Sequence, residues 1–474
     1  MKLFSLRLTT LKSKLYAIVF ASFVVRVMAF FALPNSASNL APDEGTYGDL
    51  TEWIANDKSA GDYPNPGLFR ISRTLIEPAV LLNRIGVSGI NSVRIIASAY
   101  AIGTAILILY YLLKTVEQIR VENRREIVSQ KLILILFGVY CFLPSHLFWS
   151  VVGLRESATE FWAISTLILV DRIFLNRNKS FILNGILITT LLVMIYISRY
   201  QVATILGVTL VIFLIIQIRI KLARTLTVFI ILGMIIGQFF TTGVRVETSQ
   251  SFYVIDSSKP ENNSAPTNEA IKLGLNCHKD KEVLEIEGRK YTCRSLGTRE
   301  SIIGVRNPIS PLIGQGISLE SNNESNQIGA KSAIKSVSCV PQVPEYLVKP
   351  VCLLYRAPYT TFTFLFRPIL PQDITSESSR LAAVENFLWF SSFLFIVVMF
   401  IRNRRLAFFN SLAPSLLFFS IYSVTAGAYE GNMGTAFRHK SLILWVVLLL
   451  IASTIVATQQ RKAEQQGISG PSQE

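Results

Sequence analysis

The sequence has few of the side chains that soluble enzymes use for chemistry. Only 16% of its 474 residues are charged, three are histidine and five are cysteine. No His or Cys residues stand at zinc-ligand spacing, and no P-loop, G-x-S-x-G or dinucleotide-binding glycine motif occurs. These absences argue against a zinc enzyme, a P-loop nucleotidase, an α/β hydrolase and a Rossmann dehydrogenase.

Long apolar runs are what the sequence has instead. Hydrophobic residues make up 51% of the chain, and a soluble core would not need so many runs of about 18 or more apolar residues. The first run is too long for a signal-peptide core and has no small-residue cleavage site, so we expect a retained helix. The pattern predicts an all-α polytopic membrane protein with about ten transmembrane helices. We place them at 15–33, 93–113, 132–151, 156–174, 181–197, 201–218, 225–242, 384–401, 406–425 and 441–458.

Positive charge lies in the short segments between these runs. Cytoplasmic loops retain Lys and Arg, so basic segments should mark the inside. Both termini are therefore predicted to be cytoplasmic, in a plasma (inner) membrane. The net charge of +15 is explained by topology, and we expect no nucleic-acid partner. The inside segments are then 1–14, 114–131, 172–180, 219–224, 402–405 and 459–474, and every one is basic.

This topology divides the chain into three parts. Residues 1–242 hold the first seven predicted helices, with a first extracytoplasmic loop at 34–92. Residues 243–383 form an extracytoplasmic domain, and 384–474 hold three more helices and a cytoplasmic tail.

Two stretches of the outside regions are not simply polar. The stretch 66–90 is amphipathic at helical spacing, and 353–372 is aromatic and basic between prolines. We expect both to lie in the membrane interface as helices or re-entrant pieces, with a further span as the alternative for 353–372.

The extracytoplasmic domain is predicted to contain disulfides. It holds Cys277, Cys293, Cys339 and Cys352, whereas Cys141 lies in a predicted span. Four cysteines in an oxidising compartment fit two disulfides. Three pairings are open; we favour the sequence-local one, 277 with 293 and 339 with 352, and four free thiols are the alternative.

Few ionisable residues lie well inside the predicted spans, and we single out Arg26 and Glu160. Transporters and proton pumps usually carry such groups deep in the membrane. The unusual polar residues gather instead at the outer ends of the spans. This distribution favours chemistry at one membrane face over transport.

An acidic stretch follows the first span. "APDEGTYGDL" (41–50) carries Asp43, Glu44 and Tyr47. A carboxylate there can deprotonate an acceptor hydroxyl or hold a divalent cation. The plainer alternative is that Asp43 caps a helix.

Cations stand at the outer ends of other spans, against the charge bias that orients the helices. A bound anion is a good reason to keep them there, and phosphate suits because Arg pairs with its oxygens in bidentate fashion. The alternatives are snorkelling arginines and interfacial anchors. The predicted phosphate-binding residues are His146, Arg155, Glu156, Arg199, Arg438, His439 and Lys440, together with Tyr47.

These segments together resemble the integral-membrane glycosyltransferases of the GT-C fold class. The resemblance rests on many helices, an acidic pair in a long outside loop after the first helix, and a later outside domain. "FLPSHLFWSVVGLRES" and "GNMGTAFRHK" are also similar to segments of bacterial membrane proteins of surface-polysaccharide synthesis. The resemblance implies a polyprenyl-phosphate sugar donor and a glycan or lipid acceptor. It also implies that Asp43 and Glu44 act as catalytic base or as ligands of Mg²⁺ or Mn²⁺.

We therefore expect a transferase whose active site faces the extracytoplasmic side, with Asp43 as base and Glu44 as its partner or a metal ligand. A polymerase or ligase using lipid-pyrophosphate-linked glycans shares most of this chemistry and stays open. So does a lipid-linked-sugar flippase or exporter, which needs a charged central cavity. A scaffold whose outside domain binds a partner is the remaining alternative.

Overall fold

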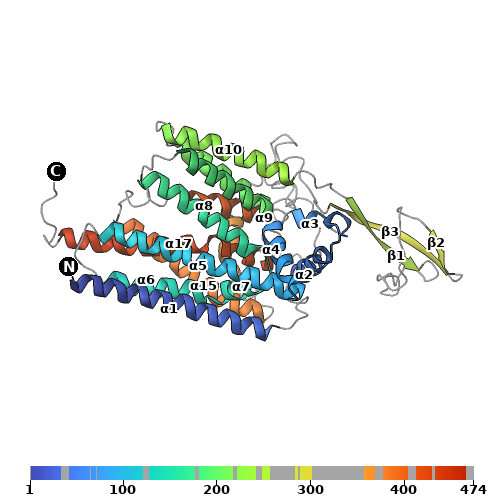
Figure 1. Ribbon diagram of the computed structural model, residues 1–474, viewed down its shortest axis with the longest axis horizontal. Coiled ribbons are helices and arrows are strands. Elements are labelled where there is room, and N and C mark those ends of the chain that lie inside the picture. The colour runs from blue at the N-terminus through green and yellow to red at the C-terminus, as the bar shows by residue number, and fades with distance from the viewer. Residues whose placement is uncertain are drawn as a thin grey trace.

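The computed structural model describes the chain as a bundle of helices with smaller elements at one end (Figure 1). The start of α1 and the end of α17 lie at the same end of this bundle, and α2 to α4 lie at the other (Figure 1). The described residues are 2–33, 42–63, 66–70, 72–120, 127–176, 181–216, 221–241, 248–256, 283–286, 289–300, 357–368, 377–403, 413–429 and 433–465.

The bundle is built from apolar segments that satisfy their backbone polar groups within each helix, as a bilayer requires. Its helices are α1 (Lys2–Ala32), α5 (Gly89–Arg120), α6 (Ile127–Phe142), α7 (Pro144–Val151), α8 (Glu156–Asn176), α9 (Phe181–Ile216), α10 (Lys221–Thr241), α15 (Glu377–Asn403), α16 (Ala413–Tyr429) and α17 (Met433–Gln465).

Several helices are long and apolar enough to cross a membrane. Within the described residues these are Leu11–Ala32, Gly89–Leu113, Ile182–Ile216 and Ala382–Met399. The pair Lys131–Phe142 and Pro144–Val151, bent by 46°, makes a fifth if it is one span. This is fewer than the ten spans expected. Helix α8 carries several charges, and the described apolar parts of α10 and α16, Thr225–Gly237 and Ala413–Ala428, are shorter.

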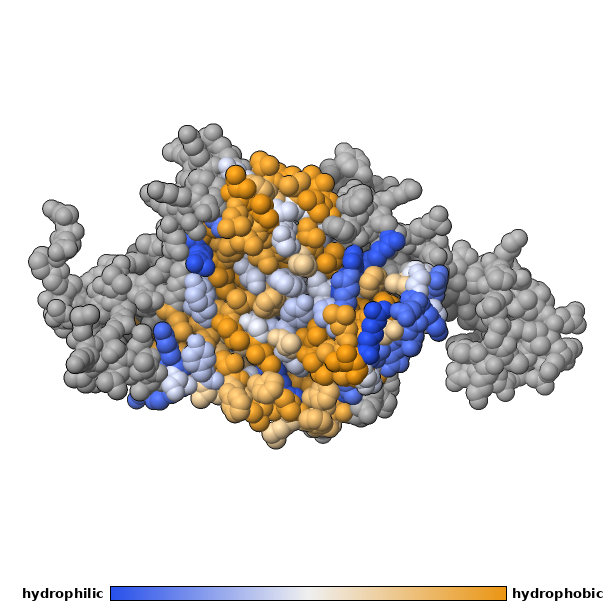
Figure 2. All heavy atoms as spheres, viewed as in Figure 1, coloured by the Kyte–Doolittle hydropathy of each residue, from blue (hydrophilic) through white to orange (hydrophobic). Residues whose placement is uncertain are grey.

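The surface agrees with a membrane environment. Hydrophobic side chains cover the middle of the visible face, and hydrophilic ones lie toward its two ends (Figure 2). Large apolar side chains such as Phe20, Met28 and Phe31 of α1 and Phe387 of α15 are exposed. The expected class of helical membrane protein is therefore confirmed.

Two breaks in the bundle have local causes. Pro144 cannot continue α6, and the residue before a proline favours extended angles, so the chain bends between α6 and α7. In α9 the backbone of Arg199 is extended (φ −162°, ψ 93°).

The chain reverses at the second break. The Tyr196 hydroxyl lies 3.2 Å from Thr204 Oγ1. In a straight helix the two residues would be about 12 Å apart along the axis. Helix α10 packs against Gly185 in the first arm of α9 and against Gly207 in the second. The two spans predicted on either side of Arg199 correspond to these arms.

Short helices cap the end of the bundle opposite the start of α1. They form the first predicted loop: α2 (Pro42–Ala55), η2 (Ala60–Asp62), α3 (Pro66–Arg70) and α4 (Arg73–Arg84). Their buried side chains join the start of α5 and the turn after α7 in a small apolar cluster. This cluster fixes α2 over the ends of the larger helices.

The segment between α10 and α15 contains a small antiparallel sheet, an element that the all-α prediction did not include. The strands are β1 (Thr248–Asp256), β2 (Val283–Ile286) and β3 (Arg289–Glu300), in the order β1-β3-β2. Cys293 lies on β3 opposite Val254. The other three cysteines of the predicted disulfides, Cys277, Cys339 and Cys352, lie outside the described residues.

Candidate functional site

The two neighbouring carboxylates of the acidic stretch face different surroundings. Both lie in the first turn of α2, where the positive end of the helix dipole favours negative charge. The Asp43 side chain is 54% exposed, whereas that of Glu44 is 1% exposed. The stretch does begin a helix, but Asp43 is the second residue of α2 and not the cap that the plainer alternative expected.

Glu44 is held by an arginine from α5. Arg94 Nε lies 2.6 Å from Glu44 Oε1, and Arg94 Nη2 lies 3.1 Å from Oε2. The backbone N–H of Gly153 also donates to Glu44 Oε1, at 2.9 Å. Both carboxylate oxygens thus have partners inside the protein.

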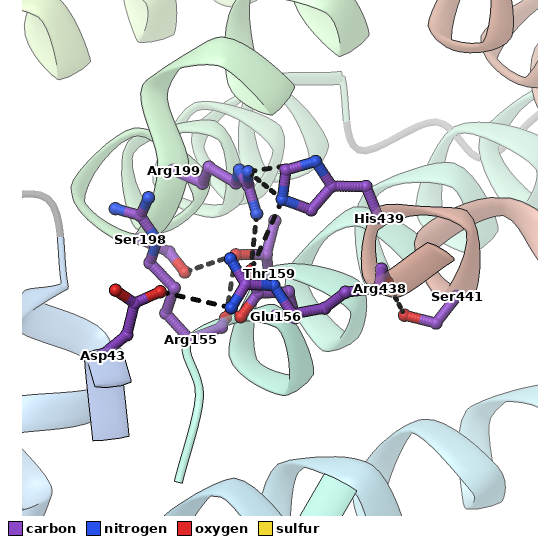
Figure 3. A network of polar contacts seen from close by, with 9 residues as sticks. All are labelled: Asp43, Arg155, Glu156, Thr159, Ser198, Arg199, Arg438, His439 and Ser441. Atoms are coloured by element: carbon purple, nitrogen blue, oxygen red, sulfur yellow. Dashed lines mark hydrogen bonds and ion pairs between the residues drawn. The ribbon is translucent and has the colours of Figure 1, made fainter. Parts of the chain in front are cut away.

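Glu156 is the centre of a separate group of charges at the start of α8 (Figure 3). Its Oε1 lies 2.8 Å from Arg199 Nη1, 3.2 Å from Arg438 Nε and 3.6 Å from His439 Nε2. A helix N-terminus adds positive potential at the same place. One buried carboxylate oxygen thus accepts from Arg199 and lies close to nitrogens of Arg438 and His439.

Arg438 joins this group to the acidic stretch. Its Nη1 donates to Asp43 Oδ2 at 3.2 Å, while its Nε lies near Glu156. The Arg438 side chain is 17% exposed, so the group reaches the surface at Asp43. Residues 395 positions apart in the sequence therefore form one site.

The reversal of α9 places Arg199 in the site. At this extended residue the guanidinium points toward α17, where it contacts the ring of His439 (Figure 3). The preceding residue, Ser198, shares a hydrogen bond of 2.8 Å with Thr159 of α8. That bond fixes the turn against α8.

Arg155 and Tyr47 complete the surroundings. The Arg155 carbonyl accepts the backbone N–H of Thr159 at 3.0 Å, which makes it the first acceptor of α8, and its side chain lies in the same group (Figure 3). Tyr47 is buried one helical turn after Asp43. Burial raises the pKa of the Tyr47 phenol; nearby Arg155 opposes this rise, and Glu156 adds to it.

We call this group the arginine cluster. Its three guanidinium groups and two carboxylates leave one formal positive charge, with His439 not counted. Guanidinium groups at a helix N-terminus bind anions such as phosphate. Its members are Asp43, Arg155, Glu156, Arg199, Arg438 and His439.

His146, a predicted phosphate ligand, lies in a different group. Its Nδ1 is 3.8 Å from Glu160 Oε2, and its ring stacks near Tyr140, whose hydroxyl donates to Glu160 Oε1 at 3.0 Å. Arg26 Nε donates to Ser150 one turn further along α7, at 2.9 Å. We call this buried group, which also includes Ser22, the interior cluster.

Lys440 also lies apart from the arginine cluster. Its buried ammonium donates to the carbonyls of Leu365 and Arg367, at 3.3 and 2.9 Å, and to Asn386 Oδ1 at 2.7 Å. These carbonyls lie at the C-terminal end of the helix at 357–366, where a cation is favourable. Lys440 thus fastens that helix and α15 to α17.

The sequence reading did not pick out Arg94. The available signal was a lone arginine at the second position of the predicted span 93–113, which implies a buried anionic partner. Nothing local in the sequence identifies that partner as Glu44, fifty residues earlier.

No set of three His, Cys, Asp or Glu side chains gathers as a metal site among the described residues. The predicted metal pair is divided, because Glu44 binds Arg94 while Asp43 contacts Arg438. Of the two, Asp43 has the carboxylate that solvent and ligands reach.

Comparison with protein-family models, curated proteins and solved structures finds no match to this chain. The fold and the site themselves define a helical membrane protein with a cationic site at one end of its bundle.

Proposed function

We propose that the chain is a membrane glycosyltransferase of the GT-C kind. It transfers a sugar from a polyprenyl-phosphate donor to a glycan or lipid acceptor in cell-surface glycan synthesis. In this proposal the bundle crosses the plasma membrane about ten times, both termini are cytoplasmic, and the arginine cluster faces the extracytoplasmic side. The observation that carries the proposal is an exposed carboxylate, Asp43, in direct contact with Arg438 of the arginine cluster, at the end of apolar helices.

The position of the site suits a lipid-linked donor. Exposed apolar side chains surround the bundle, so a polyprenyl tail can lie beside it in the bilayer. The donor's phosphate is then held at the level of the membrane surface. A soluble nucleotide-sugar would gain nothing from this placement.

Asp43 is the proposed base. Its carboxylate takes the proton of the acceptor hydroxyl while the acceptor oxygen bonds to the anomeric carbon of the sugar. The bond from that carbon to the phosphate oxygen breaks, and its electron pair leaves with polyprenyl phosphate. A single displacement of this kind inverts the anomeric carbon.

The arginines are the proposed phosphate ligands. Arg199 and Arg438 now share the oxygen of Glu156, and Arg155 stands beside them. The leaving phosphate gains negative charge as the bond breaks, and preorganised guanidinium groups stabilise that charge. His146 and Lys440, which lie elsewhere, have no part in this mechanism.

The charge of the cluster favours a monophosphate over a pyrophosphate. A sugar phosphodiester carries one negative charge, which matches the single excess positive charge of the cluster. A pyrophosphate donor carries at least two. This match supports the transferase over the polymerase, which is the nearest rival.

The test is a transfer assay on purified protein with synthetic polyprenyl-phosphate and polyprenyl-pyrophosphate sugars. It is run with and without Mg²⁺ or Mn²⁺. We expect the monophosphate donor to release polyprenyl phosphate. We expect Asp43→Asn to lower kcat/KM by about 10²–10⁴-fold, while Asp49→Asn, an exposed carboxylate on the same helix, keeps wild-type activity.

Other outcomes overturn parts of the proposal. Wild-type turnover in Asp43→Asn would remove the base assignment. Turnover of the pyrophosphate donor alone, with lengthening chains, would identify a polymerase. Donor binding without turnover of either substrate would point to a transporter or a scaffold.

A further inference from the structure

Glu44 is buried more completely, and has more partners inside the protein, than a catalytic carboxylate needs. It makes a two-pronged ion pair with Arg94, and both side chains are almost fully buried. Removing charge pairs from water is costly, so such pairs are weak evidence for stability alone. The position of this pair, between α2 and α5, indicates a different role for it.

One face of α2 docks on the start of α5. Glu44, Gly48 and Glu52 are spaced four residues apart and therefore share that face. A Cβ added to Gly48 would lie 2.5 Å from Ile90 Cγ1. The Gly89 N–H donates to Glu52 Oε1 at 2.8 Å. Residues 44, 48 and 52 thus fasten α2 along its whole length.

The next face of α2 carries the site. Asp43 and Tyr47 are each one residue before a docking residue, which on a helix is a rotation of about 100°. Asp43 therefore turns to Arg438 while Glu44 turns to Arg94. The docking of one carboxylate sets the direction of the other.

Glu44 also holds the turn that enters α8. The Gly153 N–H that it accepts comes two residues before Arg155 and three before Glu156. Gly153 is pressed against α5, since an added Cβ would lie 2.8 Å from Val93 Cγ1. One carboxylate therefore ties the turn before Arg155 to the helix that carries Asp43.

We propose that Glu44 and Arg94 form a positioning pair, which sets the distance between Asp43 and the arginine cluster. The proposal rests on the proposed function where its readout is sugar transfer. Reacting groups must be held within a fraction of an ångström, and a shift of about 1 Å costs about 10²-fold in rate. The pair should therefore affect kcat and leave donor binding nearly intact.

The first test compares Glu44→Gln, Arg94→Gln and the double variant. Each single variant leaves one buried charge without its partner and should lower thermal stability. In the double variant two amides replace the charges, so stability should largely return. We expect the double variant to bind polyprenyl phosphate with a Kd within about threefold of wild type, and its kcat to fall at least about tenfold.

A second test does not depend on activity. Cysteines at positions 43 and 438 are cross-linked with a short bifunctional thiol reagent, with and without the Glu44→Gln/Arg94→Gln changes. The same reagent on Asp57→Cys/Arg84→Cys is the control, because that exposed pair contacts at 2.8 Å in the same loop region. We expect the rate of cross-linking to fall about tenfold at 43–438 and to stay unchanged at 57–84.

The two tests separate the two proposals. Slower cross-linking in a protein whose wild type transfers no sugar would keep the positioning pair and remove the proposed function. Unchanged cross-linking, or wild-type kcat in the double variant, would overturn the positioning pair whatever the function is.

Discussion

The arginine cluster and the interior cluster are built from the same kinds of side chain but differ in charge and closure. The interior cluster has one arginine and one glutamate, Arg26 and Glu160, and is buried throughout. The arginine cluster has three arginines for two carboxylates and opens to the surface at Asp43. A balanced, closed group holds helices together, whereas an unbalanced, open group can take an anion.

The two clusters also come from different parts of the helices. The interior cluster lies between α1, α6, α7 and α8, with serine and tyrosine hydroxyls as partners. The arginine cluster is assembled from helix ends and from a break in α9. Helix ends present unpaired backbone groups and a dipole to a ligand, and the middles of helices do not.

Replacing one buried arginine from each cluster tests this difference most strongly. We expect Arg199→Met to lower kcat/KM for the polyprenyl-phosphate donor by about 10²-fold or more, because it removes a group that stabilises the leaving phosphate. Arg26→Met should change kcat/KM less than about threefold, yet lower the free energy of unfolding by about 1–3 kcal/mol through lost hydrogen bonds. Transfer kinetics and unfolding in detergent measure both effects. Equal losses of activity in the two variants would contradict the distinction.

Two glycines of α2 sharpen the comparison at the docking face. Gly48→Ala forces a Cβ against Ile90 and should cost about 1–3 kcal/mol of stability. It should also slow transfer about tenfold by displacing Asp43. Gly45, on the same helix, has nothing within 4 Å of an added Cβ, so Gly45→Ala should stabilise by up to about 1 kcal/mol. The prediction fails if the two substitutions behave alike in unfolding and transfer assays.

Tyr47 should give the smallest effect. Burial raises the pKa of its phenol, so the side chain stays protonated at neutral pH. Its contribution to stability is then present below the ordinary tyrosine pKa of about 10 and is lost as pH rises above it. Tyr47→Phe should flatten that alkaline loss of stability and change transfer at neutral pH less than about fivefold. An alkaline limb of the activity profile below about pH 9 that disappears in Tyr47→Phe would contradict this.

Much of the fold could be predicted, because its signals are local. Apolar runs located α1, α5 and α15 closely, and a lone arginine between two runs located the reversal of α9. The sheet at β1 to β3 was missed, since its strands lie in a Ser- and Asn-rich segment whose polar composition carries no clear strand pattern. Some helices are long and apolar enough to cross a membrane. The total number of membrane passes stays a prediction.

The site was predictable in part for the same reason. Asp43, Arg155, Arg199 and Arg438 were noticed because each opposes the ordinary pattern around it, and the structure places them together. Lys440 was grouped with Arg438 and His439 by adjacency. Successive helical residues point in directions about 100° apart, which sends Lys440 to α15 instead.

By itself, then, the sequence determined the class of protein, most of the helices and the stretches in which charge gathers near helix ends, because hydropathy and charge bias act over a few neighbouring residues. Only the tertiary structure decided which carboxylate is open. Asp43 and Glu44 are adjacent and chemically alike. Arg94 and Gly153, from distant parts of the chain, bind Glu44 and leave Asp43 facing the arginines. Partners brought together across 50 and 109 residues leave no local trace that a reading of neighbouring residues can use.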